Sequence, residues 1–406
     1  MLAARTTTEE LLAYLVAFDT TSRNSNLDLI AFVRDYLGAF GIESTLVPSA
    51  AGDKASLFAT IGPAGVGGVC LSGHSDVVPV DGQPWSTDPF TLTPKDDRLY
   101  GRGACDMKGF LACCLAQVPQ MLAAKLATPI HLLVSYDEEI GCTGVVPAVR
   151  RLGDDLPLPR ACIVGEPTSM RVVDAHKSGI AYVTTVTGRE AHSSMPQLGA
   201  NAIFAAAELI GELDRMRAEL VAAGDPSGRF DPPNTTLQVT VVNGGTAGNI
   251  VPRECAIRWN VRGLPGLDET VLLDRLERFG RANVLPRLRE TAPEAAITTD
   301  FVYKVPPLSP QTGSEAETLA LRLAGQNRTY TVAYGTEGGH FQAQGIPTII
   351  CGPGSIDQAH KPDEYIEVSQ LEGVRALPQG PDRGVRGVGH FSSEVGPVRA
   401  KDASEQ

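Results

Sequence analysis

Long apolar runs, cysteines and positive charges are all scarce in this sequence, and each shortage excludes a class of protein. No stretch approaches the roughly 18 consecutive apolar residues of a membrane-spanning helix, so neither a membrane span nor a membrane partner is expected. Eight cysteines in 406 residues do not make the disulfide framework of a small secreted protein. Several of them lie in apolar runs, and the N-terminus turns acidic too early for a secretory signal. We therefore expect a protein of the reducing cytoplasm.

The excess of acidic residues gives the chain a formal net charge of −12 at pH 7. Such a chain does not attract phosphate backbones, so nucleic acid is not an expected partner. Hydrophobic residues still make up 43% of the sequence, which is enough for a sizeable core and excludes wholesale disorder. A length of 406 residues predicts about two domains.

Residues 1–177 alternate helical and strand patterns, which is typical of an α/β domain. Thr7 and Glu10 have the spacing of a capping box at the start of the first helical segment. The helical segments lie at residues 7–18, 27–40 and 109–124. Short apolar runs without alternation, typical of strands buried on both faces, lie at residues 68–71, 130–134, 161–164 and 347–351. We predict a mostly parallel sheet with helices on both faces, formed by residues 1–177 and completed by residues 307–374.

Residues 178–306 have a different pattern, because their strand-like segments are longer and alternate between apolar and polar residues. Alternation indicates one buried and one wet face. Two helical segments intervene, at residues 203–220 and 272–279. The order strand–helix–strand–strand–helix–strand is the ferredoxin-like α+β pattern. We predict that this segment is an inserted α+β lid and dimerisation domain. The last 32 residues, 375–406, hold five glycines and three prolines with one aromatic residue, and predict a disordered tail.

Polar side chains follow each of the predicted buried strands. They are His74 and Asp76, the doublet Glu138-Glu139, Glu166, and finally His360. A further carboxylate, Asp106, lies where a glycine turn enters a helix. Ligands of open α/β sheets bind outside the carboxyl ends of the strands, so we expect these side chains to converge.

Two histidines and several carboxylates at one sheet edge favour a transition-metal site, since imidazole with carboxylate suits zinc, cobalt or manganese. Each residue alone has an ordinary explanation: a lone His74 is usually a surface residue, a Glu-Glu pair a solvated loop, and Asp106 a helix cap. Together these explanations require five coincidences at one edge. Neighbouring side chains of an extended segment point to opposite sides, so one member of the Glu138-Glu139 doublet could bind metal while the other acts as a base. Asp76 could accept the second ring N–H of His74.

These motifs resemble a family of co-catalytic zinc amidohydrolases and peptidases that includes acetylornithine deacetylase, succinyl-diaminopimelate desuccinylase, aminoacylase and glutamate carboxypeptidase. The matching segments are residues 72–79, 101–108, 137–139 and 165–168, together with His360. The resemblance extends over roughly nine-tenths of the chain. It implies the same two-domain fold, with a lid that forms a homodimer.

The resemblance also implies two divalent metal ions, zinc or cobalt, and a role for each residue of the site. One ion would be bound by His74 and Glu166, and the other by Glu139 and His360. Asp106 would bridge the ions. The implied catalytic residues are Glu138 as general base, Asp76 beside His74, and His192 as an oxyanion donor from the lid of a partner subunit. The implied substrate-binding residues are Arg262, Asn249, Lys177, Gly335 and Thr336.

Within the family, residues 101–110, 135–142 and 166–177 most resemble those of acetylornithine deacetylases. The implied reaction is hydrolysis of the small molecule N-acetylornithine to ornithine and acetate, in arginine biosynthesis. Three alternatives with the same metals stay open: a desuccinylase, a deacylase of another acyl amino acid, and a metallopeptidase. A fourth alternative is an inactive family member that acts as a binding protein.

Overall fold

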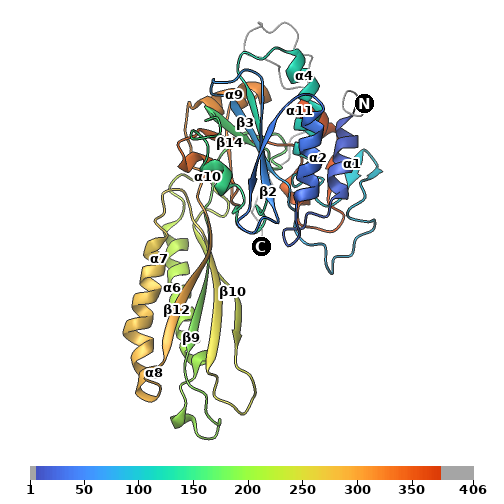
Figure 1. The fold of residues 1–406 in the computed structure, drawn as a ribbon. Helices are drawn as coiled ribbons and strands as arrows, with labels where there is room; N and C mark the ends of the chain where they lie inside the picture. The colour runs from blue at the N-terminus through green and yellow to red at the C-terminus, as the bar shows by residue number, and fades with distance from the viewer. Residues whose placement is uncertain (1–5, 376–406) are drawn as a thin grey trace, which may run out of the picture.

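Two large β-sheets, each with its own helices, organise residues 6–375, which are the residues that this computed structural model describes (Figure 1). The first sheet has eight strands in the order β1-β2-β6-β3-β7-β14-β8-β13. Its strands are β1 (Ser44–Pro48), β2 (Ala55–Ile61), β3 (Val69–His74), β6 (Ile130–Ser135), β7 (Ala161–Val164), β8 (Val173–His176), β13 (Tyr330–Val332) and β14 (Thr348–Ile350). The central strands β6, β3, β7 and β14 run parallel. The predicted α/β architecture is confirmed; the antiparallel strands β1 and β2 at one edge were not predicted.

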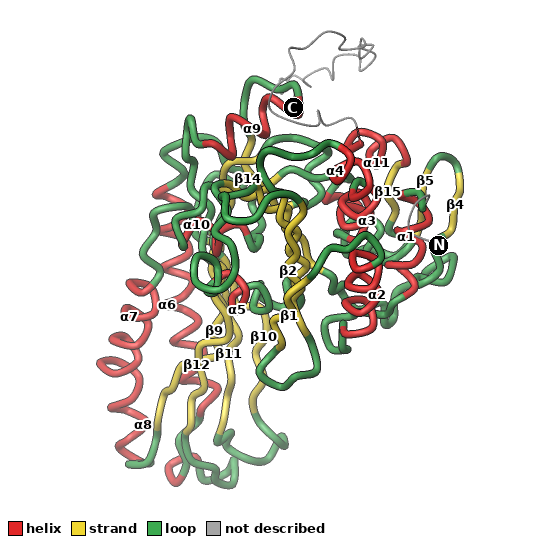
Figure 2. The backbone as a smooth tube through the Cα atoms, turned by 45° about the horizontal axis from the view of Figure 1, so that its top comes forward, coloured by secondary structure: helices red, strands yellow, loops and turns green. Residues whose placement is uncertain are grey.

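Helices cover both faces of this sheet. They are α1 (Thr8–Ala17), α2 (Leu27–Gly38), α3 (Lys108–Ala116), α4 (Val118–Ala123), α5 (Val146–Val149), α9 (Glu315–Ala324), α10 (Gly338–Ala343) and α11 (Val368–Arg375). Leu132 of β6 packs in the cluster that holds residues of α1, α2 and α3, whereas its neighbour Leu133 packs with residues of α5 and α10. Figure 2 shows α1, α2, α3 and α11 grouped together beside the strands. The non-alternating strands are therefore buried on both faces, as their sequences predict.

Of two local predictions, the capping box at Thr7 is confirmed and the single helix over residues 109–124 is wrong. The capping box is present, since Thr7 Oγ1 accepts from the amide of Glu10 at 3.2 Å and the Glu10 carboxylate accepts from the amide of Thr7 at 2.8 Å. The single helix expected over residues 109–124 is instead two helices that meet at Gln117. Pro119 lies in the first turn of α4 and has no N–H to continue the hydrogen-bond ladder of α3.

The second sheet is the lid, a four-stranded antiparallel sheet in the order β10-β11-β9-β12. Its elements are β9 (Gly179–Thr187), α6 (Ala202–Ala223), β10 (Thr236–Gly244), β11 (Glu254–Arg262), α7 (Thr270–Phe279), a π-helical turn over Gly280–Val284, α8 (Leu285–Thr291) and β12 (Ala296–Val305). Trp259 and Leu209 belong to the lid's own core, between the sheet and α6. This is the predicted ferredoxin-like order, and the fold-class prediction is confirmed.

The lid projects away from the first sheet (Figure 1). Strand β9 starts directly after β8 and runs outward, so the segment of residues 188–201, between β9 and α6, lies at the far tip. A small third sheet contains β4 (Thr93–Lys95), β5 (Arg98–Tyr100) and β15 (Tyr365–Glu367). The predicted disordered tail, 375–406, falls almost wholly outside the described residues. No helix of residues 6–375 combines the length and apolar character needed to cross a membrane.

Candidate metal centre

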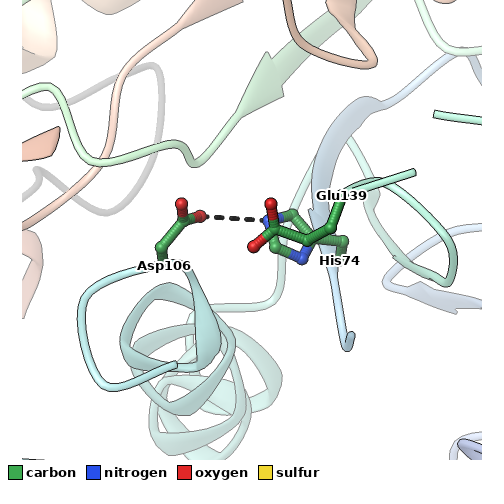
Figure 3. Close-up of side chains that lie close together, drawn as sticks. All are labelled: His74, Asp106 and Glu139. Carbon is green, nitrogen blue, oxygen red and sulfur yellow. Dashed lines mark hydrogen bonds and ion pairs between the residues drawn. The ribbon is translucent and has the colours of Figure 1, made fainter. Parts of the chain in front are cut away.

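Asp106 lies between two histidines that come from opposite ends of the sequence. Its Oδ1 is 3.1 Å from Nε2 of His74, the last residue of β3 (Figure 3). Its Oδ2 is 3.5 Å from Nε2 of His360, which follows β14. The same nitrogen of His360 is 2.9 Å from Oε2 of Glu139, and Nε2 of His74 is 3.9 Å from Oε1 of Glu166. The five predicted ligands therefore converge, and the two oxygens of Asp106 face two different halves of the site.

The donor atoms of this cluster fit metal ions. Ligand atoms of His74, Asp106 and Glu139 lie within 4.8 Å of one another, as do those of His74, Glu138 and Glu166. Oε1 of Glu166 is buried and has no hydrogen-bond donor. A buried carboxylate oxygen without a partner is costly, and a cation at this position would satisfy it. The mixture of imidazole nitrogen and carboxylate oxygen suits transition metals.

The pKa values of the clustered carboxyl and imidazole groups also favour bound cations. Burial, with the neighbouring carboxylates, raises the pKa of Glu138 to about 8 and that of Glu139 to about 7. Hydrogen bonds to Asp106 and Glu139 raise the pKa of His360 to about 10. Burial opposes ionisation of Asp106, but hydrogen bonds to both histidines hold its pKa well below the usual range. Four buried or half-buried carboxyl groups thus face only two histidines, so the cluster can accommodate added positive charge.

The carboxylate of Asp76 positions the glutamate doublet through hydrogen bonds to its backbone. It accepts the backbone amides of Glu138 at 3.0 Å and of Glu139 at 3.3 Å, and the hydroxyl of Ser22 at 2.6 Å. Nδ1 of His74 donates to the main-chain carbonyl of Asp76 at 2.9 Å. The distance from the same nitrogen to Oδ1 of the Asp76 carboxylate is 3.6 Å. The residue expected to orient His74 does so mainly through its backbone.

The two side chains of the doublet have different partners. Oε1 of Glu138 accepts from the thiol of Cys142 at 3.1 Å, whereas Glu139 pairs with His360. Asp137, just before the doublet, has a φ of 53° and pairs with the buried ammonium of Lys54 at 2.5 Å. This left-handed backbone position is uncommon outside glycine and turns the chain sharply as it leaves β6. The two side chains of the doublet therefore point in different directions, that of Glu138 toward Cys142 and that of Glu139 toward His360.

The predicted substrate-binding residues do not all lie together, unlike the predicted metal ligands. Arg262 ends β11, and its guanidinium lies against Gly179 where the lid begins. Gly335 lies beside Val305, the last residue of β12, so it too is at the junction with the lid. The hydroxyl of buried Thr336 accepts from the amide of Gly338.

Lys177 lies at the same junction, with its carbonyl beside Gly335, whereas Asn249 lies in the lid. The ammonium of Lys177 donates to the carbonyls of Pro232 at 2.8 Å and Asn234 at 2.7 Å, and the residue is fully buried. Two of the three N–H donors of this ammonium are therefore already in use within the protein. Asn249 is exposed in the loop between β10 and β11, and its carbonyl accepts from the amide of Ser193.

His192 belongs to residues 188–201, between β9 and α6, and Figure 1 shows this segment at the tip of the lid, remote from the first sheet. The residue is exposed, and Nδ1 is 2.7 Å from the hydroxyl of Ser194. The main chain of His192 forms an isolated bridge with Ile250. The fold therefore does not bring His192 to the metal cluster of its own chain.

Three further charged residues around the cluster were missed by sequence reasoning. Lys54 pairs with Asp137 as described above. Glu364 pairs with Arg102 at 2.8 Å and accepts the amides of Cys105 and Asp106. Glu337 is fully buried and accepts two serine hydroxyls. For Glu337 the available signal was a charged residue among small residues, in Gly335-Thr336-Glu337-Gly338-Gly339.

Similarity to known proteins extends over most of the chain. Acetylornithine deacetylase of Proteus mirabilis (strain HI4320) is 35% identical over 365 residues, which cover 89% of this chain and 90% of that protein. The acetylornithine deacetylase of Pasteurella multocida (strain Pm70) is 34% identical, with 87% and 90% covered.

The fold matches solved structures as well. An M20 family metallo-carboxypeptidase from Sulfolobus solfataricus superposes with a TM-score of 0.70 at 20% identity, covering 90% of this chain and 96% of that one. A dinuclear metal-binding peptidase of the M20 family from Bacillus subtilis gives 0.63 at 15% identity, covering 91% and 96%. The sequence profile of peptidase family M20/M25/M40 matches residues 70–377. The chain therefore belongs to peptidase family M20/M25/M40 and is a metal-binding hydrolase of amide bonds.

Proposed function

We propose that the chain is a metal-dependent deacetylase that hydrolyses N-acetylornithine to ornithine and acetate. The observation that carries the proposal is the placement of Asp106, which turns one carboxylate oxygen toward His74 and the other toward His360. This is the arrangement that a shared ligand of two cations requires. The deacetylase names of relatives about one-third identical over most of the chain support the substrate.

In this proposal His74 and Glu166 would hold one cation, Glu139 and His360 would hold the other, and Asp106 would be shared between them. Zinc or cobalt fits the nitrogen and oxygen donors. When bound, two such cations polarise the acyl carbonyl and lower the pKa of a water molecule to about 7. The protein supplies the ligand geometry, which Asp76 fixes through the backbone of the doublet.

Glu138 is the proposed general base, because its neighbour Glu139 is the member of the doublet that faces His360. The carboxylate of Glu138 takes a proton from the attacking water, whose oxygen bonds to the acyl carbon. The carbon–nitrogen bond then breaks, and Glu138 delivers the proton to the departing amine. The products are acetate and the free α-amino group of ornithine. Cys142, which donates to Oε1, holds the carboxylate in one orientation.

The developing oxyanion needs a hydrogen-bond donor, and we assign this role to His192 of a partner subunit. A homodimer formed through the lid would bring the tip of one chain over the site of the other. Support comes from the apolar surface that the lid exposes: Phe204 is 72% exposed and Leu198 is 55% exposed, and β10 is an edge strand. Exposed apolar side chains of this kind, next to an unpaired strand edge, favour a protein partner.

The substrate carboxylate is assigned to Arg262, with Asn249 and the backbone of Gly335 and Thr336 nearby. A guanidinium can hold a carboxylate through two parallel hydrogen bonds. Ornithine production places the reaction in arginine biosynthesis. The cytoplasm is the proposed compartment, because all eight cysteines are buried and free.

A substrate panel tests the proposal. Chelated and reloaded enzyme is assayed on N-acetylornithine, succinyl-diaminopimelate and acetylated neutral amino acids, and the highest kcat/KM is expected for N-acetylornithine. A preference for the succinylated substrate would favour a desuccinylase, and a preference for a neutral amino acid would favour another deacylase. A protein that binds metal but turns over none of them would contradict the proposed enzyme.

A further inference from the structure

Glu337 is a buried carboxyl group immediately behind the metal cluster. Its side chain is fully buried at the start of α10, and none of the Lys and Arg residues among residues 6–375 forms an ion pair with it. Its partners are two serine hydroxyls: Oε1 accepts from Ser72 at 2.5 Å and Oε2 from Ser135 at 2.7 Å. Both serines are themselves fully buried.

The two serines belong to the strands that deliver the ligands. Ser72 lies two residues before His74 on β3, and Ser135 ends β6 just before the segment that carries the glutamate doublet. In the parallel pairing of β3 with β6, Ser135 is the register partner of His74 itself. A single carboxyl group therefore ties together the two strands whose ends set the spacing between His74 and Glu138-Glu139.

Glu337 also connects these strands to the loop proposed for substrate binding. It directly follows Gly335 and Thr336, and its carbonyl accepts from the amide of His340 in the first turn of α10. The position of this loop is thus coupled to the position of the ligand strands.

The charge of Glu337 has no protein counter-ion of its own. Burial of an unpaired carboxylate is costly, so it stays ionised only where positive charge lies nearby. Burial raises the pKa of Glu337; the hydrogen bonds from Ser72 and Ser135 oppose this most, and positive charge on the nearby His74 acts in the same direction as these hydrogen bonds. Cations in the cluster would supply the same positive charge more strongly.

We propose that Glu337 is a positioning residue for the metal centre: through Ser72 and Ser135 it fixes the two ligand-bearing strands, and its buried negative charge strengthens cation binding. The inference rests on the proposed metal site. Residues that orient ligands from behind typically contribute about 10- to 100-fold in metal affinity or activity.

The test is the affinity of the full-length chain for Zn²⁺ and Co²⁺, measured by competition with a chelator. Glu337→Gln keeps the size and can still hydrogen-bond both serines, but removes the charge. We expect metal affinity to fall about tenfold or more, with a changed visible spectrum of the Co²⁺ form. Glu337→Asp, which keeps the charge, should recover part of the affinity. The matched control is Glu212→Gln, since Glu212 is a buried carboxylate of the lid that pairs with Arg215 and Arg275.

The outcomes separate the two proposals. Unchanged metal affinity in Glu337→Gln, with only a lower melting temperature in metal-free and metal-loaded protein alike, would show a purely structural residue and overturn the inference. An equal loss of affinity in Glu212→Gln would also overturn it. A wild-type chain that binds neither metal would instead refute the proposed metal site. Should Glu337→Gln fail to fold, Ser135→Ala carries the same prediction with a smaller loss.

Discussion

Asp106 turns one carboxylate oxygen toward each of two histidines, and this single residue joins the two halves of the site. Around it, neighbouring residues of one type have different surroundings: Glu138 contacts a thiol and Glu139 an imidazole. At the scale of residues, the proposed roles of Glu138 and Glu139 therefore depend on the direction in which each side chain points from the backbone.

Exchanging each member of the doublet for alanine tests this division. Glu138→Ala should lower kcat about a hundredfold or more while metal content stays at the wild-type level, because the proposed base does not bind metal. Glu139→Ala should lose metal as well as activity. Kinetics and metal analysis of both purified variants provide the check. If Glu138→Ala lost metal and Glu139→Ala kept it, the assignment would be reversed.

The convergence of His74, Asp106 and His360 could be predicted from the sequence because polar residues follow buried parallel strands, whose carboxyl ends share one edge. The role of Glu337 could not, because its hydrogen bonds reach serines more than 200 positions earlier in the chain. The hydrogen bonds of Lys177 could not be predicted either. The resemblance implies a substrate-binding residue, and only the fold reveals that two backbone carbonyls accept from its ammonium.

At the scale of elements, periodicity predicted the strands and the order of the lid, since burial on one face or two leaves a clear pattern in the sequence. It did not predict β1, whose five residues are mostly exposed or half-buried, nor the break between α3 and α4. The break follows from Pro119, and β1 forms through its pairing with β2; neither feature is part of a repeating apolar pattern.

The contact between α3 and the residue that follows β7 is one element-scale contact with no room for a larger side chain. A Cβ atom at Gly165, which follows β7, would lie 2.1 Å from the ring of Phe110 in α3. Gly165→Ala should therefore destabilise the chain by about 2 kcal/mol, the usual cost of overpacking. Gly38→Ala in α2 is the control, because a Cβ there meets no atom within 4 Å. Urea unfolding of both variants measures the difference, and equal stabilities would contradict the predicted clash.

At the scale of the whole molecule, the lid separates His192 from its own metal cluster, so the proposal needs a second subunit. His192→Ala should lower kcat about a hundredfold with metal content intact, the usual effect of losing one oxyanion donor.

Mixing His192→Ala with Glu138→Ala protomers sharpens this prediction. In a mixed dimer one site combines an intact base with an intact partner histidine, so an equal mixture should regain about a quarter of wild-type activity. The mixed dimer is verified by two affinity tags. No recovery in that verified dimer would show that His192 does not act across subunits.

The central claim, a metal-dependent deacetylase, is tested most directly by metal removal and return. Purified enzyme is chelated until metal analysis shows less than about one-hundredth of an ion per chain, and hydrolysis of N-acetylornithine is measured before and after Zn²⁺ or Co²⁺ is added. We predict that activity disappears with the metal, returns with either ion, and reaches its plateau at two ions per chain. Full activity in protein shown to be metal-free would contradict the account.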